Sequence, residues 1–145
     1  MIGLIQRVSE ASVTIDQQRV AHIQRGILLL LGVEKLDTPQ KAERLLERVL
    51  NYRIFEDEQG RMNRSLLDIQ GELLVVPQFT LPADTKKGNR PSFASAAPPE
   101  LGRELFDYFC AQVQQQCGTL QAGQFAANMQ VQLINDGPVT FWLTT

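Results

Sequence analysis

The feature that most constrains the fold is an unbroken apolar run at residues 27–33, which directly follows Gly26 and reads Ile-Leu-Leu-Leu-Leu-Gly-Val. A run of this length suits a β-strand that is buried on both faces. The residues before it also have strand patterns. Residues 11–15 alternate apolar and polar side chains, a turn is expected at residues 16–18, and a second short strand at residues 20–23. Residues 1–33 are therefore predicted to be rich in strands.

Two segments have the periodicity of amphipathic helices. Thr38 is a good N-cap, and Pro39 suits the first helical position because its missing N–H would have no partner there. The apolar side chains that then recur at helical spacing are Ala42, Leu45, Leu46, Val49 and Leu50. A second helix is predicted to begin near residues 98–100 and to end by Gly118. Its apolar stripe consists of Leu101, Leu105, Phe109 and Val113.

Three further segments are predicted as strands, at residues 71–76, 129–134 and 139–143, whereas residues 57–68 are polar and turn-like. The order of elements, with no repeat and no linker, predicts an α+β fold in a single domain of residues 1–145. We expect a mainly antiparallel sheet, or a barrel-like β structure, with two main helices. Asp136-Gly137 between two strands has the pattern of a hairpin turn. Pro138 complicates this interpretation, because it removes a backbone donor where the returning strand would start to pair.

Composition and charge argue against several classes of function. No segment approaches the roughly 20 apolar residues that span a bilayer. Arg7 and Glu10 interrupt the N-terminal apolar residues too early for a signal peptide, so we expect a cytoplasmic protein with no membrane partner. The formal net charge of −2 argues against a large nucleic-acid footprint. The one local basic cluster, Lys86, Lys87 and Arg90, has on its own the character of a solvated loop.

The sequence contains no recognisable pattern of residues that would bind a metal or a cofactor. Cys110 and Cys117 lie in the second helix, so their Cα atoms are about 10 Å apart along its axis, beyond the roughly 7 Å that a disulfide allows. We expect both to be buried thiols. One histidine and two cysteines offer no ligand spacing for zinc. We therefore predict no metal site and no cofactor.

Two short segments contain the candidate site. Residues 77–81, Pro-Gln-Phe-Thr-Leu, and residues 135–140, Asn-Asp-Gly-Pro-Val-Thr, each follow an apolar strand. Thr80 has no base to activate it as a nucleophile, because the only histidine, His22, lies in another strand with no acid placed to orient it. What remains is catalysis by positioning and by the backbone N–H groups of Gln78, Phe79 or Thr80, acting as an oxyanion hole.

The two segments together resemble the paired signatures of the D-aminoacyl-tRNA deacylases, written SQFTL and NxGPVT. The second signature matches fully, and the first departs only at Pro77, where the family has serine. Gln6-Arg7-Val8 and residues 87–93 also resemble family segments, so that the resemblance covers nearly the whole chain. It implies hydrolysis of D-aminoacyl-tRNA and of glycyl-tRNA, and a homodimer with its active sites at the interface.

The resemblance also implies how chirality is selected. In the family the Gly–Pro bond of the second signature, here Gly137–Pro138, is cis, and its carbonyl oxygens project into the active site of the partner subunit. There they accept hydrogen bonds from the substrate's α-amino group and leave no room for an L side chain. Arg7 and Asn135 are implied as supports for this segment. For Arg7 the alternative, drawn from the residues alone, is an arginine on the exposed face of a strand.

The tRNA contacts are implied in the same way. Phe125 and Met129 fall where the family lines the pocket for the terminal adenine, next to Pro77, although their patterns alone suggest core packing. The residues implied for contact with the acceptor end are Lys86, Lys87 and Arg90. Ala126 and Asn128 depart from the family's usual glycine and aspartate.

Two other functions stay open at this point. A related branch that tolerates some L-aminoacyl substrates also has proline at position 77, and this would give an enzyme for mischarged L-alanyl-tRNA. That branch has alanine where this chain has Phe79. The second alternative is a non-catalytic dimer that binds the tRNA end.

Overall fold

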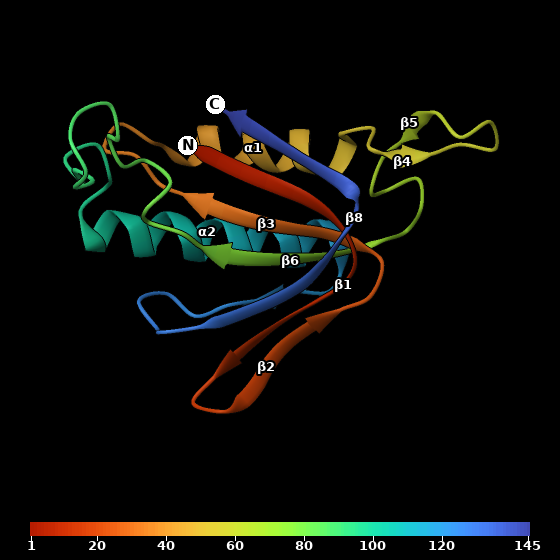
Figure 1. The fold of residues 1–145 in the computed structure, drawn as a ribbon, viewed down its shortest axis with the longest axis horizontal. Helices are drawn as coiled ribbons and strands as arrows, with labels where there is room; N and C mark the ends of the chain where they lie inside the picture. The colour runs from red at the N-terminus through yellow and green to blue at the C-terminus, as the bar shows by residue number, and fades with distance from the viewer.

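The central element of the fold is β1, residues Ile2–Ile15, which pairs with three other strands (Figure 1). The computed structural model describes residues 1–145. The other elements in chain order are β2 Gln18–Ile23, β3 Gly26–Gly32, α1 Pro39–Asn51, β4 Phe55–Glu56, β5 Met62–Arg64, β6 Glu72–Pro77, α2 Pro99–Cys117, β7 Gln121–Ala122 and β8 Gln130–Thr144. Both helices lie behind the sheet in Figure 1.

The sheet bends because the two halves of β1 pair with different strands. From Ile2 to Val8 it pairs antiparallel with β3, and from Ala11 to Ile15 it pairs antiparallel with β2. β8 runs antiparallel to β1 opposite both parts. The strands β1, β2 and β8 therefore leave the plane of β3 and β6 and give the sheet its barrel-like curvature (Figure 1).

The strand order is β2-β1-β3-β6-β7, with β8 paired to β1. β3 and β6 are parallel, as are β6 and β7. A parallel pair needs a long crossover connection, and α1 with the β4–β5 hairpin supplies it between β3 and β6. The prediction of an α+β fold with a mainly antiparallel or barrel-like sheet and two main helices is confirmed.

β3 is buried on both faces, as its unbroken apolar run predicts. Ile27, Leu29 and Leu31 belong to the larger core of 23 buried residues, which includes side chains of both helices. Leu28, on the opposite face, belongs to a second core of 8 buried residues that includes Val8 of β1 and Leu74 of β6. The two cores thus hold β3 and β6 rigidly between them. The candidate site lies at the end of β6.

The start of α1 and the end of α2 lie where their capping residues predict. Thr38 Oγ1 accepts a hydrogen bond from Lys41 N at 3.4 Å, and Pro39 is the first residue of α1. α2 ends at Cys117, and the capping residue Gly118 has a φ of 75°, the left-handed conformation that favours glycine at this position. Neither helix is both long and apolar enough to cross a membrane.

Three expectations are wrong. No hairpin turn forms at Asp136–Gly137, because both halves of the C-terminal segment pair with β1 and form the single strand β8. Residues 57–68 are not turn alone, since Met62–Arg64 pairs with Phe55–Glu56 as a small hairpin. Cys117 is only half-buried, near the end of α2, although Cys110 is buried as expected.

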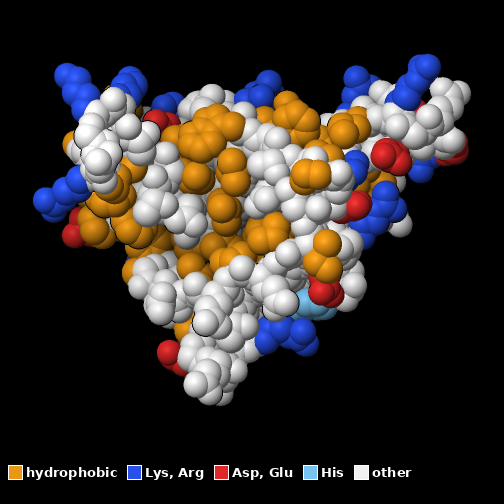
Figure 2. Space-filling model, viewed as in Figure 1, with side chains coloured by type: hydrophobic (Ala, Val, Ile, Leu, Met, Phe, Trp, Pro, Cys, Tyr) orange, Lys and Arg blue, Asp and Glu red, His pale blue; other side chains and the backbone are white.

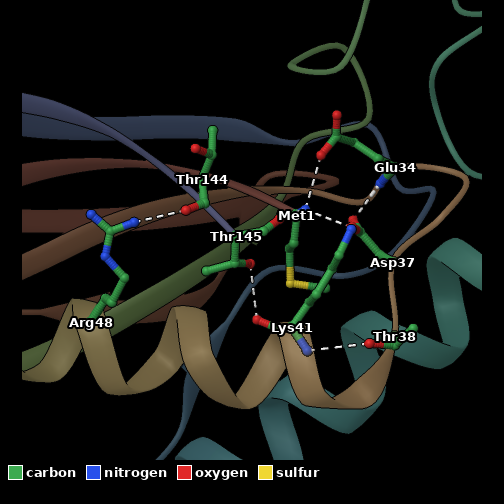
Figure 3. Close-up of polar contacts among 8 residues, drawn as sticks. All are labelled: Met1, Glu34, Asp37, Thr38, Lys41, Arg48, Thr144 and Thr145. Carbon is green, nitrogen blue, oxygen red and sulfur yellow. Dashed lines mark hydrogen bonds and ion pairs between the residues drawn. The ribbon is translucent and has the colours of Figure 1, made fainter.

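A buried ion cluster ties the start of β1 to α1 and to the end of β8 (Figure 3). The Met1 ammonium donates to Asp37 Oδ1 at 2.6 Å, to Glu34 Oε2 at 2.9 Å and to Thr145 O at 2.9 Å. Asp37 Oδ1 also lies 3.3 Å from Lys41 Nζ. The Asp37 side chain is fully buried, so these donors compensate the cost of removing its charge from water.

Candidate active site

The first signature segment turns away from the sheet at the end of β6. Gln78 N donates to Leu31 O of β3 at 2.8 Å, which continues the β3–β6 pairing one residue past Pro77. The chain then turns, and Leu81 N donates to Gln78 O at 3.3 Å. The N–H groups of Phe79 and Thr80 make no hydrogen bond within the protein. Two adjacent backbone donors are therefore free at the surface.

The side chains of this turn are exposed and arranged by one another. Gln78 Nε2 donates to Thr80 Oγ1 at 2.6 Å. Because the Thr80 hydroxyl accepts this bond, its own hydrogen is free to donate to a ligand. The Phe79 side chain is 64% exposed, and its ring centroid lies 5.4 Å from that of Phe93.

Thr80 has no general base in the structure. His22, on β2, pairs with Ser12 of β1 and donates its backbone N–H to Gln121 Oε1. No acidic side chain forms an ion pair with His22. The arrangement has no triad and provides instead two free backbone donors and a free hydroxyl at one turn.

A pocket of about 590 Å³ opens beside this turn. Of its 18 lining residues 13 are hydrophobic, which suits a flat aromatic or apolar ligand group. Pro77, Gln78 and Phe79 form one wall, and Phe125 and Met129 lie in the segment that forms another. The predicted binding residues Pro77, Phe125 and Met129 thus line one pocket together with Gln78 and Phe79.

Close packing fixes the wall that contains Phe125. A Cβ added at Gly102 of α2 would lie 3.2 Å from Phe125 Cζ, so the ring lies directly against the helix backbone. Gln124 N donates to Met129 Sδ at 3.4 Å, which holds the thioether at the same wall. Ala126 has a φ of 63°. This conformation favours glycine, which the resembled family usually has at this position.

The second signature segment is a bulge within β8. Gln6 pairs with Thr140 and Val8 pairs with Asn135, so residues 136–139 lie opposite Arg7 alone. The peptide bond Gly137–Pro138 is cis, as the resemblance implies. Both of these residues are exposed on the bulge.

Arg7 is buried beneath this bulge and is not on an exposed face, with only 7% of its surface accessible. Its Nε donates to Asp136 O at 3.0 Å, and its Nη1 donates to Ile54 O at 2.8 Å. Nε also lies 3.6 Å from Asp136 Oδ2. One guanidinium therefore joins the bulge to the connection between α1 and β4.

Asn135 closes the base of the bulge. Its Nδ2 donates to Thr140 Oγ1 at 2.9 Å, and its Oδ1 accepts from Val139 N at 3.1 Å. A Cβ added at Gly137, where φ is 128°, would lie 2.7 Å from Val139 Cγ2. The backbone of the bulge is thus closely held, whereas its outer surface is free.

The structure brings some of the predicted site residues together and leaves others apart. Gly137 and Pro138 do not line the pocket of their own chain. Lys86, Lys87 and Arg90 are exposed in the β6–α2 connection and form no ion pair within the protein. Sequence reasoning missed the pocket residues of α2, Pro99, Gly102 and Phe106. Their helical spacing indicates only that they face the core, and it contains no signal of a pocket.

Similar proteins identify the family of this chain. A family model described as D-Tyr-tRNA(Tyr) deacylase matches residues 4–144. The chain belongs to this family. Members in other organisms are similar along their whole length. A D-aminoacyl-tRNA deacylase of Cronobacter sakazakii is 58% identical over 143 residues, covering 99% of both chains. One of Haemophilus influenzae is 57% identical over 145 residues, covering 99% of both chains.

Solved structures have the same fold. A protein described as "c-Myc DNA Unwinding Element Binding Protein" is 40% identical, with a TM-score of 0.94 over 100% of this chain and 99% of that one. A probable eukaryotic D-amino acid tRNA deacylase has a TM-score of 0.89, covering 99% of this chain and 98% of that one, at 17% identity. The second similarity concerns the fold alone.

Proposed function

We propose that this protein hydrolyses the ester bond of D-aminoacyl-tRNA and of glycyl-tRNA, releasing the amino acid and free tRNA. Family membership over residues 4–144 supports the reaction class. The observation that carries the proposal is the apolar pocket directly beside two free backbone donors and the Thr80 hydroxyl. Because its substrate is cytoplasmic, we propose that this single deacylase domain of residues 1–145 acts in the cytoplasm.

The pocket is proposed to hold the terminal adenosine of the tRNA. Its volume of about 590 Å³ and its aromatic wall suit a nucleobase, with Phe125 and Met129 beside the base and Pro77 at the edge. The unpaired cations Lys86, Lys87 and Arg90 then contact the acceptor end. A small basic loop is sufficient for a protein that binds only the end of a tRNA, and this agrees with a net charge of −2.

The ester lies at the turn in this proposal. The N–H groups of Phe79 and Thr80 stabilise the carbonyl oxygen as it becomes an oxyanion during attack by water. Gln78 N–H is bonded to Leu31 O, so Gln78 contributes by orienting the Thr80 hydroxyl. The tRNA's own 2′-hydroxyl assists the water, and the ester bond to the 3′-oxygen breaks. The protein supplies geometry, and an activated ester requires little more.

Selectivity is proposed to come from a second copy of the chain. Gly137 and Pro138 are exposed and lie outside the pocket of their own protomer. Inserted into the pocket of a partner, their carbonyl oxygens would accept hydrogen bonds from the α-amino group and exclude an L side chain. Glycine has no side chain to exclude, which is why glycyl-tRNA is a substrate.

The surface beside the bulge supports a two-fold homodimer. Phe141 and Trp142 of β8 are 36% and 52% exposed, and hydrophobic side chains lie across the sheet face that the helices leave uncovered (Figure 2). In a two-fold dimer the same patch of both protomers meets and makes two equivalent sites. Light scattering at working concentration should give a dimeric mass; a monomeric mass with full activity would contradict the dimer.

A panel of four substrates tests the function. The protein is incubated with D-tyrosyl-, glycyl-, L-alanyl- and L-tyrosyl-tRNA, and loss of the ester is followed. We expect hydrolysis of the first two and not of L-tyrosyl-tRNA. Loss of L-alanyl-tRNA without loss of D-tyrosyl-tRNA would instead assign the L-tolerant function that Pro77 suggests. Stability of all four esters would leave only a role in binding the tRNA end.

A further inference from the structure

A cation outside the basic loop lies against the wall of the pocket. Arg103 is on α2, and its guanidinium carbon lies 4.9 Å from the centroid of the Phe125 ring. Phe125 and Gly102, the residue before Arg103, both line the pocket. The Arg103 side chain is exposed and forms no ion pair within the protein.

The local packing explains how Arg103 is held. Because Gly102 has no side chain, the Phe125 ring lies against α2, and the next side chain reaches over the ring. A guanidinium is attracted to an aromatic face, and this contact restricts the arginine rotamers. The N–H groups at the edge of the guanidinium stay free, and they match two oxygens of a phosphate. Arg103 is therefore a preoriented hydrogen-bond donor for an anion.

The pocket itself does not neutralise an anionic ligand, because no lysine or arginine is among its lining residues. A nucleotide held there would bring its backbone phosphate to the rim. Lys86, Lys87 and Arg90 follow Phe79 and precede Phe93 in the chain, and both aromatic residues line the pocket. Lysine and arginine side chains are visible at the left end of Figure 2, where Figure 1 has the β6–α2 connection. Arg103 adds a cation beside the wall that contains Phe125.

We propose that Arg103 binds a backbone phosphate of the RNA strand whose 3′-terminal nucleoside occupies the pocket. This inference rests on the proposed function, and it adds a binding residue on α2 that neither signature segment contains. The phosphate lies in one of the last two linkages of the strand, because the Arg103 guanidinium lies against the Phe125 ring, which lines the pocket. The basic loop then contacts the strand independently of Arg103.

The test uses an uncharged RNA hairpin that ends in CCA, with and without neutral methylphosphonates at its last two linkages. Arg103→Ala should weaken binding of the natural RNA about tenfold, the range for a hydrogen bond to a charged group at an exposed site, and binding of the neutral RNA less than twofold. Arg103→Lys, which keeps the charge but not the planar fork, should fall between the two. Arg44→Ala is the matched control, since Arg44 is an exposed arginine on α1 that pairs with Glu47.

The outcomes separate the inference from the proposed function. Equal affinity of Arg103→Ala and the wild-type protein for the natural RNA would overturn the inference alone, and so would an equal loss for both RNAs, since Arg103 would then only support Phe125. Failure of the wild-type protein to bind the natural RNA while it still hydrolyses D-tyrosyl-tRNA would also overturn the inference alone, whereas failure to hydrolyse D-tyrosyl-tRNA would overturn the proposed function as well. Hydrolysis of D-tyrosyl-tRNA by the wild-type protein tests the proposed function independently of Arg103.

Discussion

At the scale of single residues, the candidate site consists of groups that the fold leaves without partners. The sequence predicts an oxyanion hole formed by backbone N–H groups of Gln78, Phe79 or Thr80. The structure leaves two of them free, because Gln78 N–H is bonded to Leu31 O. Leu31 lies on β3, far from Gln78 in sequence, and only the parallel pairing of β3 with β6 brings them together. The strand that ends at the first signature could therefore be predicted from local residues, and the use of the backbone donors that follow it could not.

Thr80 is proposed to orient the substrate and not to attack it. Thr80→Ala and the isosteric Thr80→Val remove the hydroxyl and should lower kcat about ten- to a hundredfold, the range for one lost hydrogen bond to a developing charge. Thr80→Ser keeps the hydroxyl and should retain most of the activity. Single-turnover hydrolysis of D-tyrosyl-tRNA measures these rates. A covalent acyl-enzyme at Thr80, trapped by mass spectrometry, would contradict substrate-assisted attack by water.

The two thiols should differ in reactivity. Burial, and to a lesser extent the Asp107 charge, raises the pKa of Cys110 to about 12, whereas partial burial raises the pKa of the half-exposed Cys117. The thiolate is the reactive form, so at pH 8 iodoacetamide should modify Cys117 slowly and Cys110 only after unfolding. Both raised values also predict that stability is full below the unfolded thiol pKa of about 8.5 and falls as the pH rises above it.

Peptide mass spectrometry of the native protein and of the protein in urea checks the order of modification. Modification of Cys110 in the native protein at the rate of the unfolded chain would show that the interior of α2 opens readily.

At the scale of elements, local and long-range interactions differ in how well the sequence predicts them. The start of α1 follows from Thr38 and Pro39, which act within one turn of the helix. The continuity of β8 depends on its register with β1, and a cap or turn residue contains no information about that register. Asp136-Gly137 has the local pattern of a hairpin, but both halves of β8 pair with β1 instead of with each other. The extra residues between the two halves therefore form the bulge.

The side chain of Arg7 fixes this bulge of β8. Arg7→Ala leaves Asp136 O and Ile54 O without their donor and should lower the free energy of unfolding by about 2–4 kcal/mol. The bulge would then be less closely held, and the ratio of D-tyrosyl- to L-tyrosyl-tRNA hydrolysis should fall. Arg7→Lys should behave similarly, because a single ammonium does not replace a fork whose Nε and Nη1 reach two carbonyls.

Urea unfolding and paired deacylation rates measure both effects of the Arg7 change. Arg19→Ala, on the exposed part of β2, is the control and should alter neither. An Arg7→Ala variant that is destabilised but still discriminates fully between the two enantiomers would mean that the bulge does not need this support.

At the scale of the whole molecule, the pocket is assembled from segments distant in sequence. Pro77 ends β6, Gly102 belongs to α2, and Phe125 precedes β8. Each of these segments has an ordinary core-packing pattern, so that α2's contribution could not be predicted from spacing. The two signatures, by contrast, are local and locate one wall of the pocket and the Gly137–Pro138 segment, but they do not predict that this segment forms a bulge within one strand. In the proposed dimer, the pocket of one protomer meets the bulge of the other.

The central claim is that pocket and bulge come from different protomers. Ala127→Trp fills the pocket, which Ala127 lines. Gly137→Val distorts the bulge, since its Cβ would lie 2.7 Å from Val139 Cγ2. Each homodimer should lose most of its D-tyrosyl-tRNA hydrolysis while keeping a dimeric mass.

A mixed dimer of these two variants, purified through two different affinity tags, tests the claim most directly. One of its two sites combines an intact pocket with the intact bulge of the partner, and the other combines both changes. The measurement is the D-tyrosyl-tRNA deacylation rate of the mixed dimer. If the site is shared, that rate should return to about half of the wild-type rate per dimer. A mixed dimer no more active than the average of its two parent homodimers would contradict a site shared between protomers.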